Sequence, residues 1–585
     1  MDVVAAAVCG LDTAAIHSWF SRALERLRVN QPVLNEANVY PVADADTGTN
    51  MYLTLRGGLR ALESAPSPAS PTDAYALVAQ GAITSARGNS GIILSEYLRG
   101  FSQSATQATP QISPARQLAD ALKYSSDRAF AAVAQPVQGT ILTVARAAAS
   151  AADALIFDDC GPVDVARAAL GAGQSALEQS SLELGALARA NVLDAGAYGL
   201  VIILSALESV LAGGEQSSVS GALAGERASL AQAPVAPEPV VPTPAPQMSQ
   251  AQASSPHTAT GEAWGSDELH SYDRAVGSGP PADFDSKADD SSVDGEFEVM
   301  YLVRAHTHGT GTDQFSVRLR GALADLGESV VVVGGDTSPG EALWNVHVHT
   351  DTPDLALKAA ETVAVDLGIE HATLSRVLVR DLLRQVTNAG GPQSVICTAS
   401  PGLAPDLARG GAVVLLARDG RATLSDVSRG RSEAEGDGTM IVVNSVELRQ
   451  QVQDAYPTDH VIVAGDDARV VAVATAMTLA ASGGEPPRGP AELAAHLQEV
   501  ADRAATWRFD QPTREALRTL ILGEVPPRPG AIPIVTILAD ERCPVSLLTD
   551  LHAGVEGANP EAELITLGSG RKGHGLTMSI EWVEQ

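Results

Sequence analysis

The chain has 585 residues, and at roughly 100 to 200 residues per domain this length predicts about three or four domains rather than one core. Hydrophobic residues make up 45% of the chain but aromatic residues only 4%, so its cores must be built mainly from Ala, Val, Leu and Ile. Acidic residues (70) outnumber basic residues (39), which gives a formal net charge of −31. This charge repels phosphate backbones and anionic membranes, so we expect no nucleic acid as a partner.

The four cysteines lie far apart and none forms a C-x-x-C pair. This excludes a Cys-rich metal module and a disulfide framework, and it favours a reducing compartment. The start of the chain has no basic region of a secretory signal, and the apolar stretch at residues 199–207 is much shorter than the ~20 residues of a membrane-spanning helix. We therefore expect a cytoplasmic protein with no integral membrane segment.

Residues 10–213 are predicted to form an all-helical domain. Apolar side chains recur there at i, i+3 and i+4, as at Ile16, Trp19, Phe20 and Ala23, which is the period of a helix with one buried face. We find no convincing alternating strand in this region. The next segment, residues 214–296, is rich in Pro, Ala, Ser and acidic residues and is predicted to be a disordered linker, because proline at that density cannot support helix or sheet.

Two further domains are predicted after the linker. Residues 297–390 show the order strand, helix, strand, strand, helix, which is typical of a small α+β domain. Residues 391–585 alternate apolar strands with helical segments and are predicted to form an α/β domain with a mostly parallel sheet.

The most informative segment is residues 38–51, NVYPVADADTGTNM. Two carboxylates, Asp44 and Asp46, precede a loop that can bend at a glycine, and Mg²⁺ prefers one or two carboxylates together with phosphate and water oxygens. An EF-hand calcium loop is excluded, because the glycine comes one position too early and Leu55 stands where a bidentate Glu is required. A capping turn before a helix remains the structural alternative. The polar residues after the second carboxylate are candidate ligand contacts: Thr47, Gly48, Thr49 and Asn50.

Three more glycine-containing loops precede apolar helical runs in the same domain. Glycine permits close approach of the backbone, and helix N-terminal amides bind anions. Arg87 is predicted either to contact phosphate or to cap a surface, and Asp194 is a candidate acceptor for a ribose hydroxyl or an adenine-side contact. The other candidate cofactor-binding residues in these loops are Gly88, Asn89, Ser90, Gly91, Gly139, Thr140 and Gly196.

These four motifs, VYPVADADTGTNM, TSARGNSGIILSEYLRG, PVQGTILTVAR and VLDAGAYGL, resemble in order and spacing the nucleotide-binding L-type domain of dihydroxyacetone kinases, in the version that begins the catalytic A subunit of bacterial fatty acid kinases. The resemblance implies an eight-helix antiparallel barrel that binds ATP and two Mg²⁺ ions. By position, Asp44 and Asp46 would be metal ligands. A third aspartate of the soluble dihydroxyacetone kinases has Asn38 as its nearest counterpart, which leaves the third ligand open.

The resemblance continues after the linker. YLVRAHTHGTGTDQF and NVHVHTDTP are similar to the middle domain of the same subunit, in which a cysteine and two histidines surround zinc. Here the histidines are His347 and His349, but Leu302 stands at the cysteine position. Structural zinc therefore stays open, with His306 or His308 as substitutes, and a substrate or interdomain role for His347 and His349 is the alternative.

The last domain resembles the DegV-related C-terminal region of the family. Residues 568–573, GSGRKG, fit the dinucleotide pattern G-x-G-x-x-G, but a strand-like segment follows instead of a helix, so we predict a hairpin or loop. The chain has only four lysines and no G-K-[ST], which excludes a P-loop and the protein kinase signature. Phosphate chemistry would have to depend on carboxylate-bound Mg²⁺.

The sequence thus favours an ATP-dependent phosphotransferase, and by resemblance a fatty acid kinase catalytic subunit. The implied reaction transfers the γ-phosphoryl group of ATP to a fatty acid bound by a separate carrier protein, with His347 and His349 in the catalytic surface. A dihydroxyacetone-type small-molecule kinase and a nonenzymatic ATP and Mg²⁺ sensor or scaffold are the alternatives. The resemblance leaves a homodimer open, and neither the acyl preference nor the identity of the carrier follows from the sequence.

Overall fold

The computed structural model describes most of the chain outside the predicted linker. The described residues are 7–43, 45–65, 70–155, 160–190, 192–213, 295–306, 312–338, 340–369, 371–382, 384, 394–417, 422–434, 438–481 and 489–584. Almost all of the predicted linker, and also Asp44 and His308, lie outside these residues.

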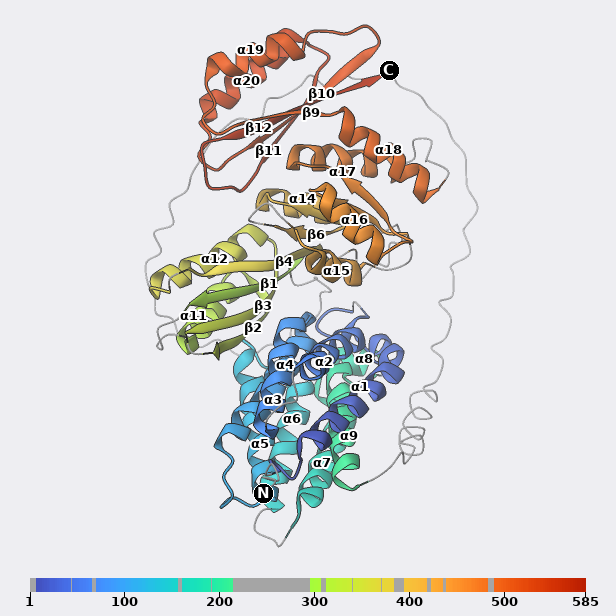
Figure 1. The fold of residues 1–585 in the computed structure, drawn as a ribbon, viewed down its shortest axis with the longest axis vertical. Coiled ribbons are helices and arrows are strands. Elements are labelled where there is room, and N and C mark those ends of the chain that lie inside the picture. The colour runs from blue at the N-terminus through green and yellow to red at the C-terminus, as the bar shows by residue number, and fades with distance from the viewer. Residues whose placement is uncertain are drawn as a thin grey trace, which may run out of the picture. The chain divides into compact units, whose positions relative to one another are not determined.

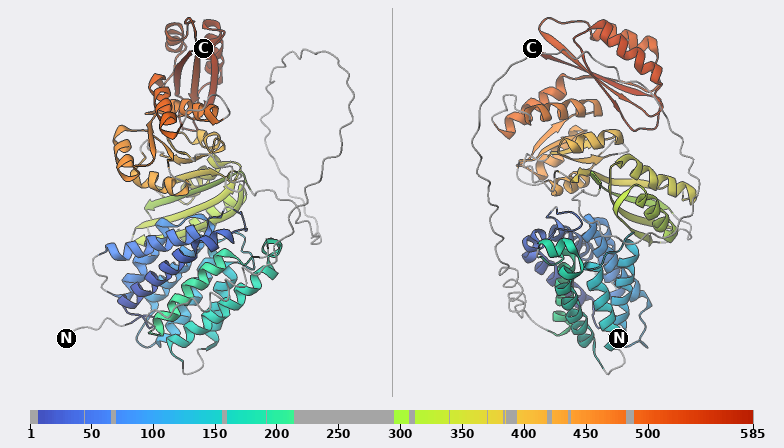
Figure 2. Two further views of the ribbon diagram at one scale, coloured as in Figure 1. Left: turned by 90° about the vertical axis from the view of Figure 1, so that its right-hand side faces the viewer. Right: turned by 180° about the vertical axis from the view of Figure 1, so that it is seen from behind.

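The N-terminal region is all-helical, as predicted. Its helices, which Figures 1 and 2 show packed alongside one another, are α1 (Thr13–Glu36), α2 (Thr47–Ser64), α3 (Pro71–Ser85), α4 (Gly88–Gln107), α5 (Pro114–Ala132), α6 (Ile141–Ala154), α7 (Pro162–Glu183), α8 (Gly185–Ala190) and α9 (Ala195–Leu211). In α1 the buried side chains are those that the helical period selected, among them Trp19 and Phe20, whose ring centroids lie 4.4 Å apart. The barrel arrangement implied by the resemblance stays an expectation.

Polar residues define where these helices begin. The side chains of Asp12, Ser70, Ser113, Thr140 and Asp194 each accept a hydrogen bond from a backbone N–H in the first turn of α1, α3, α5, α6 and α9 respectively. Each bond satisfies one of the backbone donors that a helix leaves without an intrahelical partner. The loops of the third and fourth sequence motifs therefore end at capped helix N-termini. α2 and α4 begin at Thr47 and Gly88, within the first and second motifs, without a side-chain cap.

An eight-stranded sheet follows, with the strand order β2-β3-β1-β4-β6-β5-β7-β8. Its strands are β1 (Phe297–His306), β2 (Gly327–Ser338), β3 (Glu341–Thr350), β4 (Thr373–Asp381), β5 (Ser394–Thr398), β6 (Ala412–Leu416), β7 (Met440–Val443) and β8 (His460–Val463). β1 to β4 pair antiparallel, and β5 to β8 pair parallel. β4 and β6 join the two halves, so one sheet crosses the position, after residue 390, where we predicted a domain boundary.

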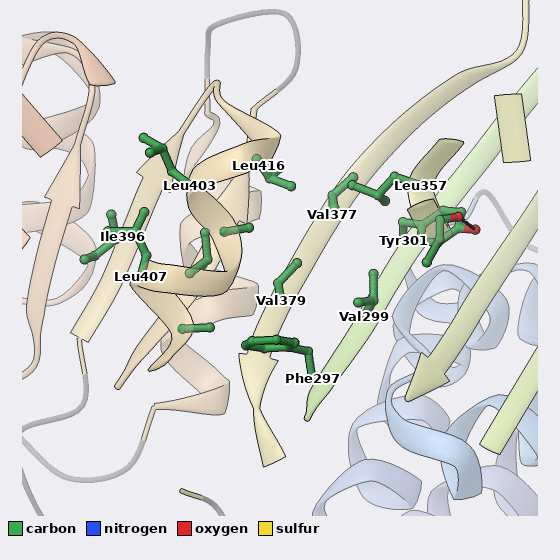
Figure 3. Packing of buried hydrophobic residues seen from close by; sticks show 14 of the residues in the cluster. Phe297, Val299, Tyr301, Leu357, Val377, Val379, Ile396, Leu403, Leu407 and Leu416 are labelled. Carbon is green, nitrogen blue, oxygen red and sulfur yellow. Dashed lines mark hydrogen bonds between the residues drawn. The ribbon is translucent and has the colours of Figure 1, made fainter. Parts of the chain in front are cut away.

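One face of this sheet forms the main hydrophobic core. Alternate residues of β1, namely Phe297, Val299, Tyr301 and Val303, are fully buried there, and Figure 3 shows the first three near Val379 and Val377 of β4. The helices that accompany the sheet are α11 (Thr312–Ala324), α12 (Pro353–Asp366), η2 (Pro401–Leu403), α14 (Ala404–Arg409), α15 (Leu424–Glu433), α16 (Val446–Ala455), α17 (Asp467–Ala481) and α18 (Pro490–Arg503). Because side chains alternate along a strand, the other face of β1 and β3 carries a second set of residues, to which the candidate site belongs.

A four-stranded sheet with the order β11-β10-β12-β9 completes the described chain. Its elements are β9 (Ala505–Phe509), α19 (Arg514–Glu524), β10 (Ala531–Ala539), α20 (Val545–Ala558), β11 (Glu563–Gly568) and β12 (Leu576–Glu584), and Figure 1 shows α19 and α20 together beside it. In this sheet only the β10 and β11 pair is parallel. The parallel pairing predicted for residues 391–585 is therefore confirmed for β5 to β8 and wrong for β9 to β12.

The GSGRKG motif lies in the loop between β11 and β12, and a strand follows it, as predicted. Arg571 of this loop donates to Ser400 Oγ at 2.9 Å, next to the end of β5, and Ser400 Oγ donates to Asp467 Oδ2 at 2.6 Å. The motif therefore connects the two sheets through a polar cluster, which is a structural role.

Replacing Trp344 with Ala tests the core. Trp344 is fully buried with its ring centroid 4.2 Å from that of Phe315, and removing such a side chain leaves a cavity that costs about 3 to 5 kcal/mol. We expect a loss of this size in the free energy of unfolding, measured by urea denaturation with circular dichroism. The control, Val365→Ala, changes a side chain that is 77% exposed and should shift stability by less than about 0.5 kcal/mol. Equal stability of the two variants would contradict this placement of the core.

Candidate nucleotide and metal site

A cavity of about 170 Å³ lies where the four sequence motifs meet. Every motif loop contributes to its wall, and so does the beginning of β2. The predicted site residues that line it are Thr47, Asn89, Ser90, Thr140, Asp194 and Gly196. The structure therefore brings together residues from loops that are distributed along almost the whole helical region.

Helix N-termini give this cavity its chemical character. α2 begins at Thr47, α4 at Gly88, α6 at Ile141 and α9 at Ala195. The first turn of a helix presents unsatisfied N–H groups and the positive end of the helix dipole, which together favour an anion such as phosphate. The Thr47 and Ser90 hydroxyl oxygens lie 3.4 Å apart at this place. In a chain of net charge −31, backbone amides can bind phosphate without any lysine.

The glycines of the motifs serve the packing of the helices as well as the cavity. A Cβ at Gly48 would lie 2.6 Å from the Gln31 carbonyl oxygen of α1, and Gly88 has a φ of +53°, which side chains disfavour. Thr49 connects the same two helices, because its hydroxyl accepts hydrogen bonds from Gln31 Nε2 at 2.8 Å and Asn35 Nδ2 at 3.0 Å. These residues hold α2 against α1.

Of the two aspartates predicted to bind the metal, Asp46 is the one that the structure describes. It stands before α2 but makes no capping hydrogen bond, so the capping-turn alternative does not account for its side chain. Its carboxylate instead accepts from Arg380 Nη2 at 3.1 Å. Burial raises the pKa of Asp46 and Arg380 opposes that shift. Asn38 is buried just after α1, and its role as a third metal ligand stays a prediction.

Arg380, on β4, was missed by the sequence analysis although it is the central cation of this site. Its three guanidinium nitrogens each face a different carboxylate: Glu298 on β1, Glu433 Oε2 on α15 at 3.2 Å, and Asp46. The side chain is only 9% exposed. The signal that could have revealed it is a charged residue within an otherwise apolar strand, a feature that Glu298 shares.

Arg87 is part of the same network. It was a candidate phosphate contact, but its guanidinium donates to Glu433 Oε1 at 2.9 Å and to the Ser432 hydroxyl. A buried arginine, Arg429, lies near Arg87. Burial is the largest cause that lowers the pKa of Arg429, and the positive charge of Arg87 lowers it further. In this structure Arg87 thus connects the second motif to α15.

His347 and His349 lie on one face of β3, as their spacing predicted. Both are buried, and their Nε2 atoms are 3.0 Å apart, so one ring donates to the other. Glu298 Oε1 lies 3.4 Å from His347 Nδ1. Burial, together with the Arg380 charge, lowers the pKa of both imidazoles to about 3, which keeps them neutral at physiological pH.

The donor set around these histidines does not fit a closed zinc site. Within the described part of the chain, Glu298, His347 and His349 are the one group of metal-binding side chains that cluster, whereas a structural zinc site has four ligands. The Glu298 carboxylate already pairs with Arg380. Leu302 packs with Ile83 and Leu343 in a small apolar cluster, and His306 is exposed at the end of β1. We therefore assign no chemical step to zinc.

The face that carries the histidines packs against the helical region. Asn345 Nδ2 donates to the Ile83 and Ala86 carbonyl oxygens at 3.0 and 3.3 Å, and Gly334 N donates to Glu96 Oε1 at 3.1 Å. Arg376 Nη1 donates to the Thr84 carbonyl oxygen at 2.6 Å. The polar face of the sheet therefore meets the helical region that carries the motif cavity.

Comparison with known proteins agrees with this arrangement. Residues 41–209 match the DAK2 domain, and residues 294–388 match the middle domain of proteins like the A subunit of fatty acid kinase. These two matches support a relation of the chain to the fatty acid kinase A-subunit family. It is similar to an uncharacterised protein of Staphylococcus saprophyticus (38% identity over 32% of this chain and 34% of the relative) and to protein YloV of Bacillus subtilis (35% identity over the same shares). The aligned part thus spans about a third of the length of these relatives.

Among solved structures, the chain is similar to the dihydroxyacetone kinase of C. freundii. The form in complex with AMP-PNP and Mg²⁺ shares 18% identity over 34% of each chain with a TM-score of 0.26, and the native form shares 18% identity over 36% of each chain with a TM-score of 0.28. Scores this low carry no argument about fold or function. Among the described helices, none combines the length and the hydrophobicity that a membrane crossing needs.

Replacing Arg380 with Ala should destabilise the protein strongly. The change leaves Glu298 and Glu433, which are 2% and 5% exposed, without their shared counter-ion, and breaking a buried ion pair in this way costs about 3 to 5 kcal/mol. The measurement is the free energy of unfolding in urea. Arg409→Ala removes the exposed pair with Glu296 and should cost at most about 1 kcal/mol. If both variants lost the same small amount, Arg380 would not hold these elements together.

The zinc content of the purified protein tests whether His347 and His349 hold zinc without a cysteine at position 302. We expect clearly less than one zinc per chain after purification without added metal, because two imidazoles and an arginine-paired carboxylate are an incomplete ligand set. Leu302→Cys adds a thiolate on the same strand face and should raise the zinc content, measured by elemental analysis. The control Val303→Cys places the thiol on the opposite face. One tightly held zinc in the unmodified protein would show that other residues complete the site.

Proposed function

We propose that this protein is the catalytic A subunit of a fatty acid kinase, which transfers the γ-phosphoryl group of ATP to a fatty acid presented by a separate carrier protein. The matches to the DAK2 domain and to the middle domain support a kinase-related role. The observation that carries the proposal is the convergence of four motif loops, each at a helix N-terminus, on one cavity beside Asp46. This arrangement suits the binding of a polyphosphate together with a metal ion.

Each group has a defined task in the proposed site. The N-terminal amides of α2 and α4 and the hydroxyls of Thr47 and Ser90 would bind the phosphates, because Asp194 already accepts from amides of α6 and α9. Asp44 and Asp46 would hold Mg²⁺, which neutralises phosphate charge when bound. To release Asp46 for that purpose, the Arg380 guanidinium can keep its contacts with Glu298 and Glu433.

The proposed chemistry needs no general base. A fatty acid is already a carboxylate near neutral pH, so one of its oxygens attacks the γ-phosphorus while the bond to the β,γ-bridging oxygen breaks and ADP leaves. No proton has to be removed from the acceptor. The low pKa of His347 and His349 agrees with this, because it suits the two imidazoles to positioning and not to proton transfer. His349 contacts His347, His347 lies beside Glu298, and Glu298 pairs with the arginine that contacts Asp46.

An assay of ADP release with MgATP tests the proposal. Stimulation by oleate only when a lipid-carrier protein is present would support it, and the product should be an acyl phosphate that hydroxylamine traps. Turnover with dihydroxyacetone alone would instead identify a small-molecule kinase. Tight binding of ATP with no transfer to either acceptor would identify a sensor or scaffold.

The variant Asp46→Asn should lower turnover by about a hundredfold or more, because it removes a charge that positions the metal for phosphoryl transfer. Its circular dichroism spectrum should be unchanged. Asp127→Asn is the matched control, since Asp127 is exposed on α5 of the same helical region, and it should retain full turnover. Normal turnover of Asp46→Asn would exclude this residue from the site.

A further inference from the structure

Strand β2 of the middle region covers the nucleotide cavity. Residues 327–331 line it together with the helical motifs. The contact is made by the backbone: Ala134 N–H donates to the Val330 carbonyl oxygen at 3.2 Å, and Val133 forms an isolated antiparallel bridge with Val331. The cavity is therefore shared by two regions of the chain that the predicted linker, residues 214–296, separates in sequence.

The part of β2 that meets the cavity is a β-bulge. Glu328 pairs with His349 and Val331 with His347, so two residues of β2 stand opposite one residue of β3. Ser329, inside the bulge, has a φ of +51°. Bulges redirect side chains and are enriched next to active sites. Here the bulge places Glu328 and Ser329 at the wall of the cavity.

Two carboxylates line the cavity among the described residues, Asp194 and Glu328. Asp194 is 6% exposed, and its oxygens accept from the backbone N–H of Ala197 at 2.7 Å and from those of Gly196 and Ile141. It is thus engaged in starting α9 and in holding α6 beside it, which makes it a poor acceptor for a ligand. Glu328 lines the cavity with an exposed side chain.

The charge of Glu328 indicates which part of a nucleotide it would meet. A carboxylate repels phosphate, and the phosphates are attracted to the helix N-termini near Thr47 and Ser90. The nucleoside must then face β2. A carboxylate can accept hydrogen bonds from two neighbouring hydroxyl groups, which is the chemistry that a ribose offers.

We propose that the nucleotide site is composite and that Glu328 of β2 accepts hydrogen bonds from the ribose hydroxyls of ATP. The proposal rests on the proposed function, since it specifies how the same cavity holds its nucleotide. It makes the middle region a determinant of nucleotide affinity and sugar specificity.

Calorimetric titration of the full chain with MgATP, 2′-deoxyATP and 3′-deoxyATP tests the proposal. The unmodified protein should bind ATP more tightly than either deoxy analogue. Glu328→Ala should weaken ATP binding by about tenfold, as expected for a hydrogen bond to a charged group, and should remove most of the preference for ATP over the analogues. Glu341→Ala, which changes another exposed carboxylate of the same sheet, should change neither quantity.

The possible failures are distinguishable. If the unmodified chain binds ATP but Glu328→Ala keeps both its affinity and its sugar preference, the composite site is wrong and the proposed function stands. If the unmodified chain binds no MgATP, both proposals fail. Thermal unfolding of each variant checks the fold, and Glu328→Gln, which keeps the size of the side chain, should show a smaller loss of the same kind.

Discussion

The buried guanidinium of Arg380 is the interaction on which the functional region depends. It contacts carboxylates from three separate segments: the loop before α2, strand β1 and helix α15. Carboxylates this deeply buried are costly unless a cation neutralises them. If the sheet moved away from the helices, Asp46 would lose its counter-ion Arg380. The charge balance of the loop before α2 and the packing of the sheet on the helices therefore depend on each other.

The alternation of side chains along β1 and β3 makes this possible. One set of residues, including Tyr301 and Trp344, is apolar and forms the core with the covering helices. The opposite set carries Glu298, Leu302, His347 and His349 and faces the helical region. A strand buried on both faces can thus carry a stabilising face and a polar face within the same ten residues. A shift of the strand register by one residue would turn the polar set toward the core and the apolar set toward the helical region, and would disrupt both contacts.

The excess of acidic over basic residues determines which groups are left to bind phosphate. With 39 basic residues against 70 acidic ones, cations are used sparingly and at specific places. Arginines of the candidate site neutralise the chain's own carboxylates, as Arg87 does for Glu433. Backbone amides at the N-termini of α2 and α4 are then the groups that remain for phosphate, since Asp194 already accepts from amides of α6 and α9.

The sequence by itself determined the local features of this protein. Helical periodicity predicted the N-terminal helices, the four loop motifs predicted residues that do line one cavity, and the spacing of His347 and His349 predicted their common strand face. These features depend on residues close together in the chain, where backbone geometry alone decides which side chains are neighbours. The same reasoning correctly predicted that GSGRKG forms a loop with a strand after it.

Only the tertiary structure decided how these features combine. It showed that one sheet runs across a predicted boundary and that Arg87 pairs with Glu433. It also showed that the Asp194 carboxylate accepts hydrogen bonds from backbone N–H groups of α6 and α9, and that Arg380 lies beside Asp46, 334 positions away in the sequence. Such partners come from segments far apart in the chain, and a single sequence contains no local signal for the pairing of a charge with a distant counter-charge. The role of each charged residue was therefore set by the packing of the sheet on the helices, which brings together groups that local periodicity treats independently.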